Sequence, residues 1–179
     1  MSRVTDLTNR LDNCPAGDKG WREFEDLCVE ILEFLFVPPL VRPIIQARTY
    51  SGTNRRDAVF PNRNFDEKHN WGLLLRELEA RMVLFEFKNY DKMEIGSQEV
   101  IQTENYLTDP MRRLAIIVCS KIPNNGAHIQ RNNIYSRRRK VILFITKEDL
   151  KEMLFLKERG EDPCDLIVDF VERFYLQHE

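Results

Sequence analysis

The segment from Met82 to Tyr90, MVLFEFKNY, places an acid and a base inside an apolar run, and it constrains the fold more than any other stretch of the chain. In an extended strand, residues two apart share a face, so Glu86 and Lys88 lie on one side. Phe85 and Phe87 take the opposite side. Burial of charge costs free energy unless the charges pair or bind a metal. The segment therefore predicts a central strand that carries a charged site, while an exposed salt bridge at a strand end is the simpler alternative.

Length and composition fit one soluble globular domain. The chain has 179 residues, of which 42% are hydrophobic and 31% charged, and this is enough to bury a core without disulfides. Its apolar runs are too short or too interrupted to span a bilayer, and its first residues lack the pattern of a signal peptide. We therefore expect a cytoplasmic protein that is not bound to a membrane.

The residue types that commonly hold zinc or act as nucleophiles are scattered along the chain. The four cysteines and three histidines lie far apart, and no zinc-ligand spacing occurs. The sequence therefore gives little support to a histidine-based metal site or a Cys–His nucleophile. The net charge of −2 also does not indicate a polyanion-binding protein at the level of the whole chain.

The first half of the chain predicts a helix followed by a hairpin of two strands. Apolar residues recur at helical spacing from Gly20 to Phe36. The segment Val41 to Tyr50 is typical of a strand, and residues 51–54 carry a strong turn signal. A second strand over residues 55–60 then places Asp57 near its start, entering an apolar strand where solvation is less easily satisfied.

The rest of the chain alternates helices with apolar strands. We expect Asp18 and Ser97 to be helix N-caps, and residues 1–16 to form a short helix or a loosely held arm. The expected later elements are a helix at 71–78 that is inserted between strands rather than part of the core, a strand at 82–90, a helix at 98–107, a strand at 112–120, a helix at 124–138, a strand at 141–146, and helices at 147–157 and 165–176. This order predicts an α/β fold with a central mixed sheet and helices on both faces.

Basic residues gather in one segment without any acid. The members of this basic cluster are Arg131, Arg137, Arg138, Arg139 and Lys140. Such a run is often no more than a solvated face. Two further basic residues, Arg55 and Arg56, directly precede Asp57. If these residues flank a groove that leads to the site, they can contact the phosphates of a nucleic acid.

Four short motifs, taken in their order along the chain, resemble the PD-(D/E)xK nuclease superfamily. They are WREFEDL with Glu25, RRDAVF with Asp57, LFEFKNY with Glu86 and Lys88, and QTENYL with Gln102. The resemblance covers about residues 20–146 and is closest to the Mrr-like and Holliday-junction-resolvase-like branches. It implies a restriction-endonuclease-like core in a single nuclease domain over residues 18–179, with an N-terminal arm at 1–17 and C-terminal helices at 147–179.

The resemblance also implies roles for individual residues. Asp57 and Glu86 would bind Mg²⁺, with Mn²⁺ as a substitute, and Lys88 would orient or activate the attacking water. Glu25 would complete the site from the first helix. Gln102, together with Tyr106, would match the glutamine-tyrosine pair of related restriction subunits, while Gln98 competes for the glutamine role because it lies one helical turn earlier. The family's proline before the aspartate is absent, since Arg56 stands there.

Chemical reasoning adds one ligand to this set. Mg²⁺ prefers oxygen ligands and keeps several waters, so two carboxylates and a backbone carbonyl, for which Phe87 is the candidate, would suffice. Hydrolysis of a phosphodiester requires neutralisation of phosphate charge and a source of hydroxide, and a cation held in this way can supply both.

The resulting functional hypothesis is a metal-dependent DNA endonuclease of restriction or antiphage defence type. A junction resolvase or repair nuclease is the alternative within the same chemistry, and a catalytically inactive module that binds nucleic acid or a partner protein is the alternative outside it. DNA is favoured over RNA as the substrate. We expect a homodimer, for which the helix Leu166–Leu176 offers a surface unless it packs on its own core. No base-reading module is visible, so the chain could be the cleaving component of a larger complex.

Overall fold

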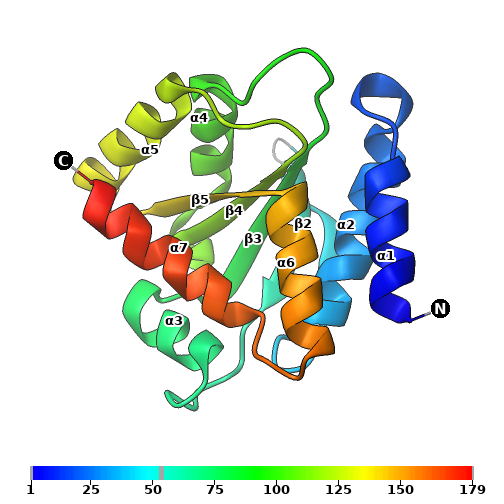
Figure 1. Ribbon diagram of the computed structural model, residues 1–179. Coiled ribbons are helices and arrows are strands. Elements are labelled where there is room, and N and C mark those ends of the chain that lie inside the picture. Colours follow the sequence, from blue (N-terminus) through cyan, green and yellow to red (C-terminus); the bar gives the residue numbers. More distant parts are fainter. Residues whose placement is uncertain (1, 53–54, 179) are drawn as a thin grey trace.

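A computed structural model describes residues 2–52 and 55–178 and forms a five-stranded mixed sheet between two layers of helices (Figure 1). The strands lie in the order in which they occur in the chain: β1 (Ile44–Arg48), β2 (Arg55–Pro61), β3 (Met82–Lys88), β4 (Leu114–Cys119) and β5 (Val141–Thr146). The first three strands are antiparallel neighbours, and β3, β4 and β5 are parallel. The predicted α/β fold with a central mixed sheet is confirmed.

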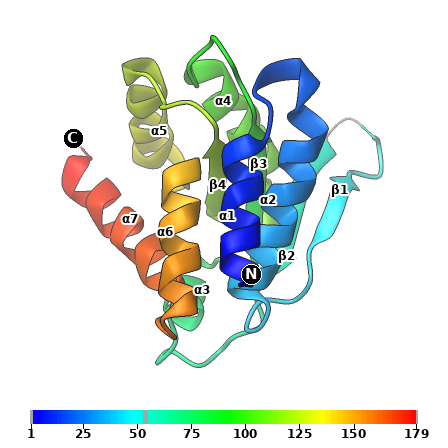
Figure 2. The same cartoon turned by 45° about the vertical axis from the view of Figure 1, so that its right-hand side comes forward.

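The helices divide between the two faces of the sheet. The described helices are α1 (Arg3–Asn13), α2 (Trp21–Phe36), α3 (Asn70–Leu78), α4 (Ser97–Tyr106), α5 (Asn125–Arg138), α6 (Lys147–Glu158) and α7 (Cys164–Gln177), with short 3₁₀ turns η1 (Gly17–Lys19) and η2 (Asp109–Met111). One face packs against α1, α2, α3, α6 and α7, and the other against α4 and α5 (Figures 1 and 2). None of these helices is long and apolar enough to cross a membrane.

The alternation of side chains along β3 decides which face holds the charged residues. Val83 and Phe85 belong to the core beneath α2 and α6, and Leu84 belongs to the smaller core beneath α4 and α5. Glu86 follows the parity of Leu84 and is therefore directed to the α4 side of the sheet. On the parallel neighbour β4 every residue is buried, as expected for a strand that is covered on both faces.

The N-terminal segment is a helix that is packed into the main core. Ser2 caps α1 by accepting a hydrogen bond from the backbone N–H of Thr5 at 3.1 Å. Val4, Leu7 and Leu11 are buried against α2 and α6. Of the two structures that the sequence left open for this segment, a short helix is therefore present, and a loosely held arm is not.

Replacing Leu7 with alanine is expected to lower the free energy of unfolding by about 2–4 kcal/mol, because Leu7 is fully buried and its removal leaves a cavity. Urea denaturation followed by circular dichroism measures the change. Asn9→Ala, on the exposed side of the same helix, serves as the control and should stay within about 0.5 kcal/mol of the wild type. Equal effects of the two substitutions would contradict the packed position of α1.

Two predicted helix caps are wrong by one or two residues. Asp18 lies in η1, and Gly20 occupies the N-cap of α2, where a Cβ would stand 1.9 Å from the carbonyl oxygen of Pro15. Gly96, rather than Ser97, is the N-cap of α4, and its N–H donates to the carboxylate of Glu99 at 2.8 Å. Neither glycine has a side-chain oxygen, so neither cap accepts the hydrogen bond that was expected of Asp18 and Ser97.

The other differences concern the extent of elements. The first strand is shorter than predicted and begins only at Ile44, and residues 53–54 of the predicted turn lie outside the described residues. The helix α3 was expected to be an insertion, but Trp71 is buried and its ring meets that of Phe36 edge to face at 5.1 Å. The closing helix α7 buries Ile167 and other apolar residues in the main core, so that face of the helix is covered by its own chain.

Candidate active site

The candidate site lies where the pairing between β2 and β3 ends. The ladder runs from Pro61↔Met82 to Ala58↔Phe85 and then stops. The next two residues opposite each other are Asp57 and Glu86. Here side-chain carboxylates, instead of backbone carbonyls, accept hydrogen bonds from backbone N–H groups. The N–H of Asp57 donates to Glu86 Oε1 at 3.3 Å. Two carboxylates therefore meet in the gap between the separating strands.

Backbone groups on β3 also open toward this gap. The N–H of Phe87 donates to Asp57 Oδ2 at 2.9 Å, so it points at β2 rather than at β4. Since the N–H and C=O of one residue in a strand point to the same side, the carbonyl of Phe87 faces the gap as well. The gap thus combines the carboxylates of Asp57 and Glu86 with one carbonyl oxygen.

Glu86 is a buried acid whose protonation is strongly affected by its surroundings. Its residue is only 2% exposed. Burial, followed by repulsion from Asp57, raises the pKa of Glu86 to about 8, and the nearby ammonium of Lys88 opposes the shift. Without a bound cation, this carboxyl group is therefore largely protonated at neutral pH.

Lys88 is held between Glu86 and the following helix. Its Nζ lies 3.8 Å from Glu86 Oε2 and donates to Gln102 Oε1 at 3.1 Å. Gln102 Nε2 in turn donates to the hydroxyl of Tyr106 at 3.0 Å. Gln98 is exposed one turn earlier on α4, and no hydrogen bond joins it to Lys88 in the described part of the chain. Of the two glutamines that the sequence left open, the structure brings Gln102 to the lysine.

Glu25 reaches the same region from α2. It is 6% exposed, and Gln46 Nε2 donates to its Oε1 at 3.3 Å. Burial raises the pKa of Glu25, and repulsion from Asp57 adds to this effect, whereas the hydrogen bond from Gln46 and the charge of Arg55 oppose it. The acids at 25, 57 and 86 are therefore close enough to influence one another.

Gln46 is a site residue that sequence reasoning missed. The register of the hairpin places it across from Asp57, between the pairs Ile45↔Ala58 and Ala47↔Arg56. Its φ of 50° lies in the left-handed region, which is uncommon for a residue other than glycine. Gln46 could have been found by counting residues across the hairpin from Asp57, but only if the position of the turn had been known.

The donor atoms in the gap suit a hard divalent cation. Two carboxylates and a carbonyl fit Mg²⁺, which is often bound by one or two carboxylates and completes its shell with water and substrate phosphate. Within residues 2–52 and 55–178, no group of three or more histidine, cysteine, aspartate or glutamate side chains could hold a metal ion. The oxygen atoms that would hold a cation at this gap are those of Asp57, Glu86 and the Phe87 carbonyl.

The expected nucleic-acid-binding residues are dispersed. Arg55 is exposed next to the site, but Arg56 is buried and its Nε donates to the carbonyl of Tyr106 at 3.1 Å. Arg131 is also buried, with its guanidinium over the rings of Phe144 and Phe174. Neither buried guanidinium is free to contact a phosphate.

The rest of the basic cluster lies at the other end of the sheet. Residues 137–140 precede β5, and Val141 pairs with Leu114 at the start of β4. Lys88 instead pairs with Cys119 at the end of β4, roughly 16 Å further along the strand direction. Within the cluster, Arg138 forms an ion pair with Glu104 at 3.0 Å. Residues 137–140 directly precede a core strand in the sequence, as predicted, but they lie at the end of the sheet that is far from the site.

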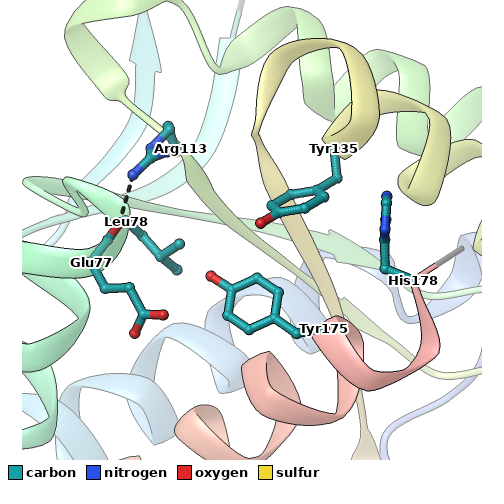
Figure 3. Close-up of a pocket in the computed structure, with 6 residues that line it drawn as sticks. All are labelled: Glu77, Leu78, Arg113, Tyr135, Tyr175 and His178. Atoms are coloured by element: carbon teal, nitrogen blue, oxygen red, sulfur yellow. Dashed lines mark hydrogen bonds between the residues drawn. The ribbon is translucent and has the colours of Figure 1, made fainter.

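A separate cavity of about 370 Å³ also lies at that distant end (Figure 3). It is lined by Glu77, Leu78, Arg113, Tyr135, Tyr175 and His178. Arg113 directly precedes β4, and its guanidinium donates to the carbonyl of Glu77 at 2.6 Å. Burial and the neighbouring Glu77 carboxylate raise the pKa of Tyr175 to about 12, so its phenol stays protonated. This cavity shares no residue with the carboxylate gap.

Part of the chain is similar to a known protein. No family model matches the chain. It is 30% identical over 115 residues to the putative transposon gamma-delta 80.3 kDa protein of Escherichia coli (strain K12). The alignment covers 64% of this chain and 16% of that relative. The chain therefore corresponds to a small part of the relative.

Proposed function

We propose that the chain is a metal-dependent nuclease that hydrolyses phosphodiester bonds, and that it is a DNA endonuclease of the PD-(D/E)xK type with a role in restriction or antiphage defence. One observation carries the proposal: Asp57, Glu86 and Lys88 meet where β2 and β3 separate. The two carboxylates accept hydrogen bonds from backbone N–H groups of these strands, and Lys88 Nζ lies 3.8 Å from Glu86 Oε2. A cation would stabilise the ionised forms of the buried Glu86 and the partly buried Asp57, which supports a catalytic rather than an architectural use.

The residues of the site divide the chemical work. Asp57, Glu86 and the carbonyl of Phe87 would hold Mg²⁺ or Mn²⁺. When bound, such a cation supplies neutralisation of phosphate charge and a lowered pKa for water. Lys88, fixed by Glu86 and Gln102, places a positive charge beside the phosphate and orients the attacking water. Cleavage of both strands of a duplex requires two such sites, so we infer that a homodimer is the active form.

The metal dependence of DNA cleavage tests this proposal. Supercoiled plasmid and single-stranded DNA are incubated with the protein in Mg²⁺, in Mn²⁺ and in EDTA. We expect cleavage with either metal and none in EDTA, and a rate about 10²-fold lower for Lys88→Ala because the positive charge beside the phosphate is lost. Lys92→Ala, which removes an exposed lysine from the loop after β3, is the matched control and should cleave normally.

Two results would refute the nuclease proposal. One is cleavage that persists in EDTA, and the other is a Lys88→Ala protein that is as active as the Lys92→Ala control. A protein that binds DNA but cleaves none under any metal condition would instead favour the inactive binding module.

Gln102 is expected to act on the rate through Lys88. Because Gln102 Oε1 accepts the hydrogen bond that holds Lys88 Nζ, we expect Gln102→Ala to lower the cleavage rate at saturating DNA by about 10-fold with little change in DNA affinity. Gln98→Ala, on the same helix, should leave both quantities unchanged. Single-turnover kinetics and fluorescence anisotropy measure the two quantities, and a larger effect at Gln98 would reverse the assignment.

A further inference from the structure

The β1–β2 hairpin continues beyond the sheet as a ribbon of two strands. Pairing of β2 with β3 ends at Ala58↔Phe85, whereas pairing of β1 with β2 continues to Arg48↔Arg55. Residues 47–48 and 55–56 therefore pair as strands with each other and not with β3. Because β2 and β3 are antiparallel, this ribbon extends from the end of the sheet where Lys88 lies, and β1 forms the outer edge of the molecule in Figure 2.

Two arginines face each other across this ribbon. Arg48 and Arg55 are directly opposite in the register, so their side chains share a face, and both are exposed. Like charges in this arrangement are unfavourable for the isolated protein. No ion pair with an acid is formed by either arginine among the described residues, although the chain forms many such pairs elsewhere. An anion bound between the guanidinium groups would remove the repulsion.

An exposed aromatic side chain follows the ribbon in the turn after β1. Tyr50 follows two residues after Arg48 and is fully exposed, with a relative accessibility of 112%. Exposed aromatic rings next to guanidinium groups are a common feature of nucleic-acid-binding surfaces, because rings pack on sugars and bases while guanidinium groups contact phosphates. The ribbon therefore carries the two kinds of contact that such a ligand uses.

The ribbon is fixed relative to the candidate active site. At its base, Arg56 donates from Nε to the carbonyl of Tyr106 at 3.1 Å and from a terminal nitrogen to Thr108 Oγ1 at 3.5 Å. These bonds join the hairpin to the end of α4, the helix that also supplies Gln102. Asp57 is the next residue along β2, so a ligand held by the ribbon lies beside the carboxylate gap.

We propose that the two-stranded ribbon docks in the major groove of double-stranded DNA, with Arg48 and Arg55 on backbone phosphates and Tyr50 against the adjoining sugar or base. This inference rests on the proposed nuclease function and names the surface that presents the duplex to the site. The major groove of B-form DNA is about 12 Å wide and admits a two-stranded ribbon. The major groove of duplex RNA is too narrow and deep for it, so the geometry selects DNA.

Binding in the absence of cleavage tests the ribbon separately from catalysis. Fluorescence anisotropy in EDTA gives the affinity of the full chain for a short DNA duplex at several salt concentrations. For Arg48→Gln/Arg55→Gln we expect about 10-fold weaker binding and a salt dependence that falls by about one ion per lost contact. The matched control, Arg137→Gln/Arg173→Gln, removes two exposed charges on α5 and α7 and should bind like the wild type. The ribbon variant should unfold at a temperature no lower than that of the wild type, because the substitutions remove the repulsion between the two arginines.

The possible results distinguish the ribbon proposal from the nuclease proposal. Normal DNA binding by Arg48→Gln/Arg55→Gln, or equal weakening in the control, overturns the ribbon surface even if the wild type cleaves DNA. Binding of duplex RNA as tight as that of DNA overturns the groove assignment. Ribbon-dependent binding without cleavage in any metal supports the ribbon and refutes the nuclease. A wild-type protein that binds no DNA overturns both.

Discussion

Replacing Asp57 with asparagine is expected to lower metal-dependent DNA cleavage by about 10³-fold, which corresponds to about 4 kcal/mol of transition-state stabilisation. Asparagine keeps an oxygen that can accept the hydrogen bond from the N–H of Phe87, so the two strands should stay in place. What it lacks is the negative charge that would hold the cation. Single-turnover cleavage of plasmid DNA in Mg²⁺ measures the rate, and circular dichroism checks the fold.

The Asp57 prediction has a matched control on the surface. Asp169→Asn removes one exposed carboxylate from α7 and should cleave at the wild-type rate. DNA affinity in EDTA should be retained by both variants, since neither changes the ribbon. If Asp57→Asn cleaves as fast as Asp169→Asn, the carboxylate gap is not the catalytic centre.

Replacing Glu86 with glutamine is expected to stabilise the metal-free protein at alkaline pH and to abolish cleavage. The pKa of Glu86 is raised from 4.5 to about 8 in the folded protein, so the folded state binds the proton more tightly than the unfolded state. Its contribution to stability is fully present below pH 4.5 and is lost as the pH rises through about 8. Glutamine does not titrate, so above pH 8 the variant should be more stable by about 2–4 kcal/mol.

Urea denaturation in EDTA across this pH range measures the effect of Glu86. The difference between Glu86→Gln and the wild type should vanish at the acid end, where both side chains are neutral. Added Mg²⁺ should stabilise the wild type but not the variant, because only the wild type retains both carboxylates. Glu172→Gln, an exposed position on α7, is the control. If the free energy of unfolding depended on pH in the same way for the wild type and Glu86→Gln, burial of the ionised Glu86 carboxylate would cost no stability.

Buried strands were the elements that sequence reasoning located best. The bounds of β5 coincide with the predicted strand at 141–146, and β4 lies within the predicted 112–120. These runs are apolar on both faces, so their burial in a parallel sheet is encoded locally. The cap at Gly20 was missed because it depends on close packing against Pro15. The cap at Gly96 was missed because Ser97 was expected to be the N-cap, although the hydrogen bond from Gly96 to Glu99 is local in the sequence.

From the sequence, the site could be predicted only within one strand, where the side chains of every second residue share a face. Glu86 and Lys88 share a face because of the period of a β-strand, and that is visible in the sequence. Gln46 was not visible, because its position depends on the register of the hairpin and on a left-handed backbone conformation. The location of Arg137 to Lys140 was also not visible, because only the fold decides which end of the sheet a segment occupies.

The early end of the pairing between β2 and β3 affects which amino-acid substitutions the fold can accept at positions 57 and 86. Where the pairing stops, Asp57 accepts from the N–H of Phe87, which would otherwise extend the ladder, and Glu86 accepts from the N–H of Asp57. Removal of one acid leaves a backbone N–H without its acceptor, whereas joint replacement of both by β-branched apolar residues would allow the strands to pair across positions 57 and 86. An alanine at either position alone would therefore leave an unpaired N–H at this step, whereas the joint replacement would close the gap in which the two carboxylates meet.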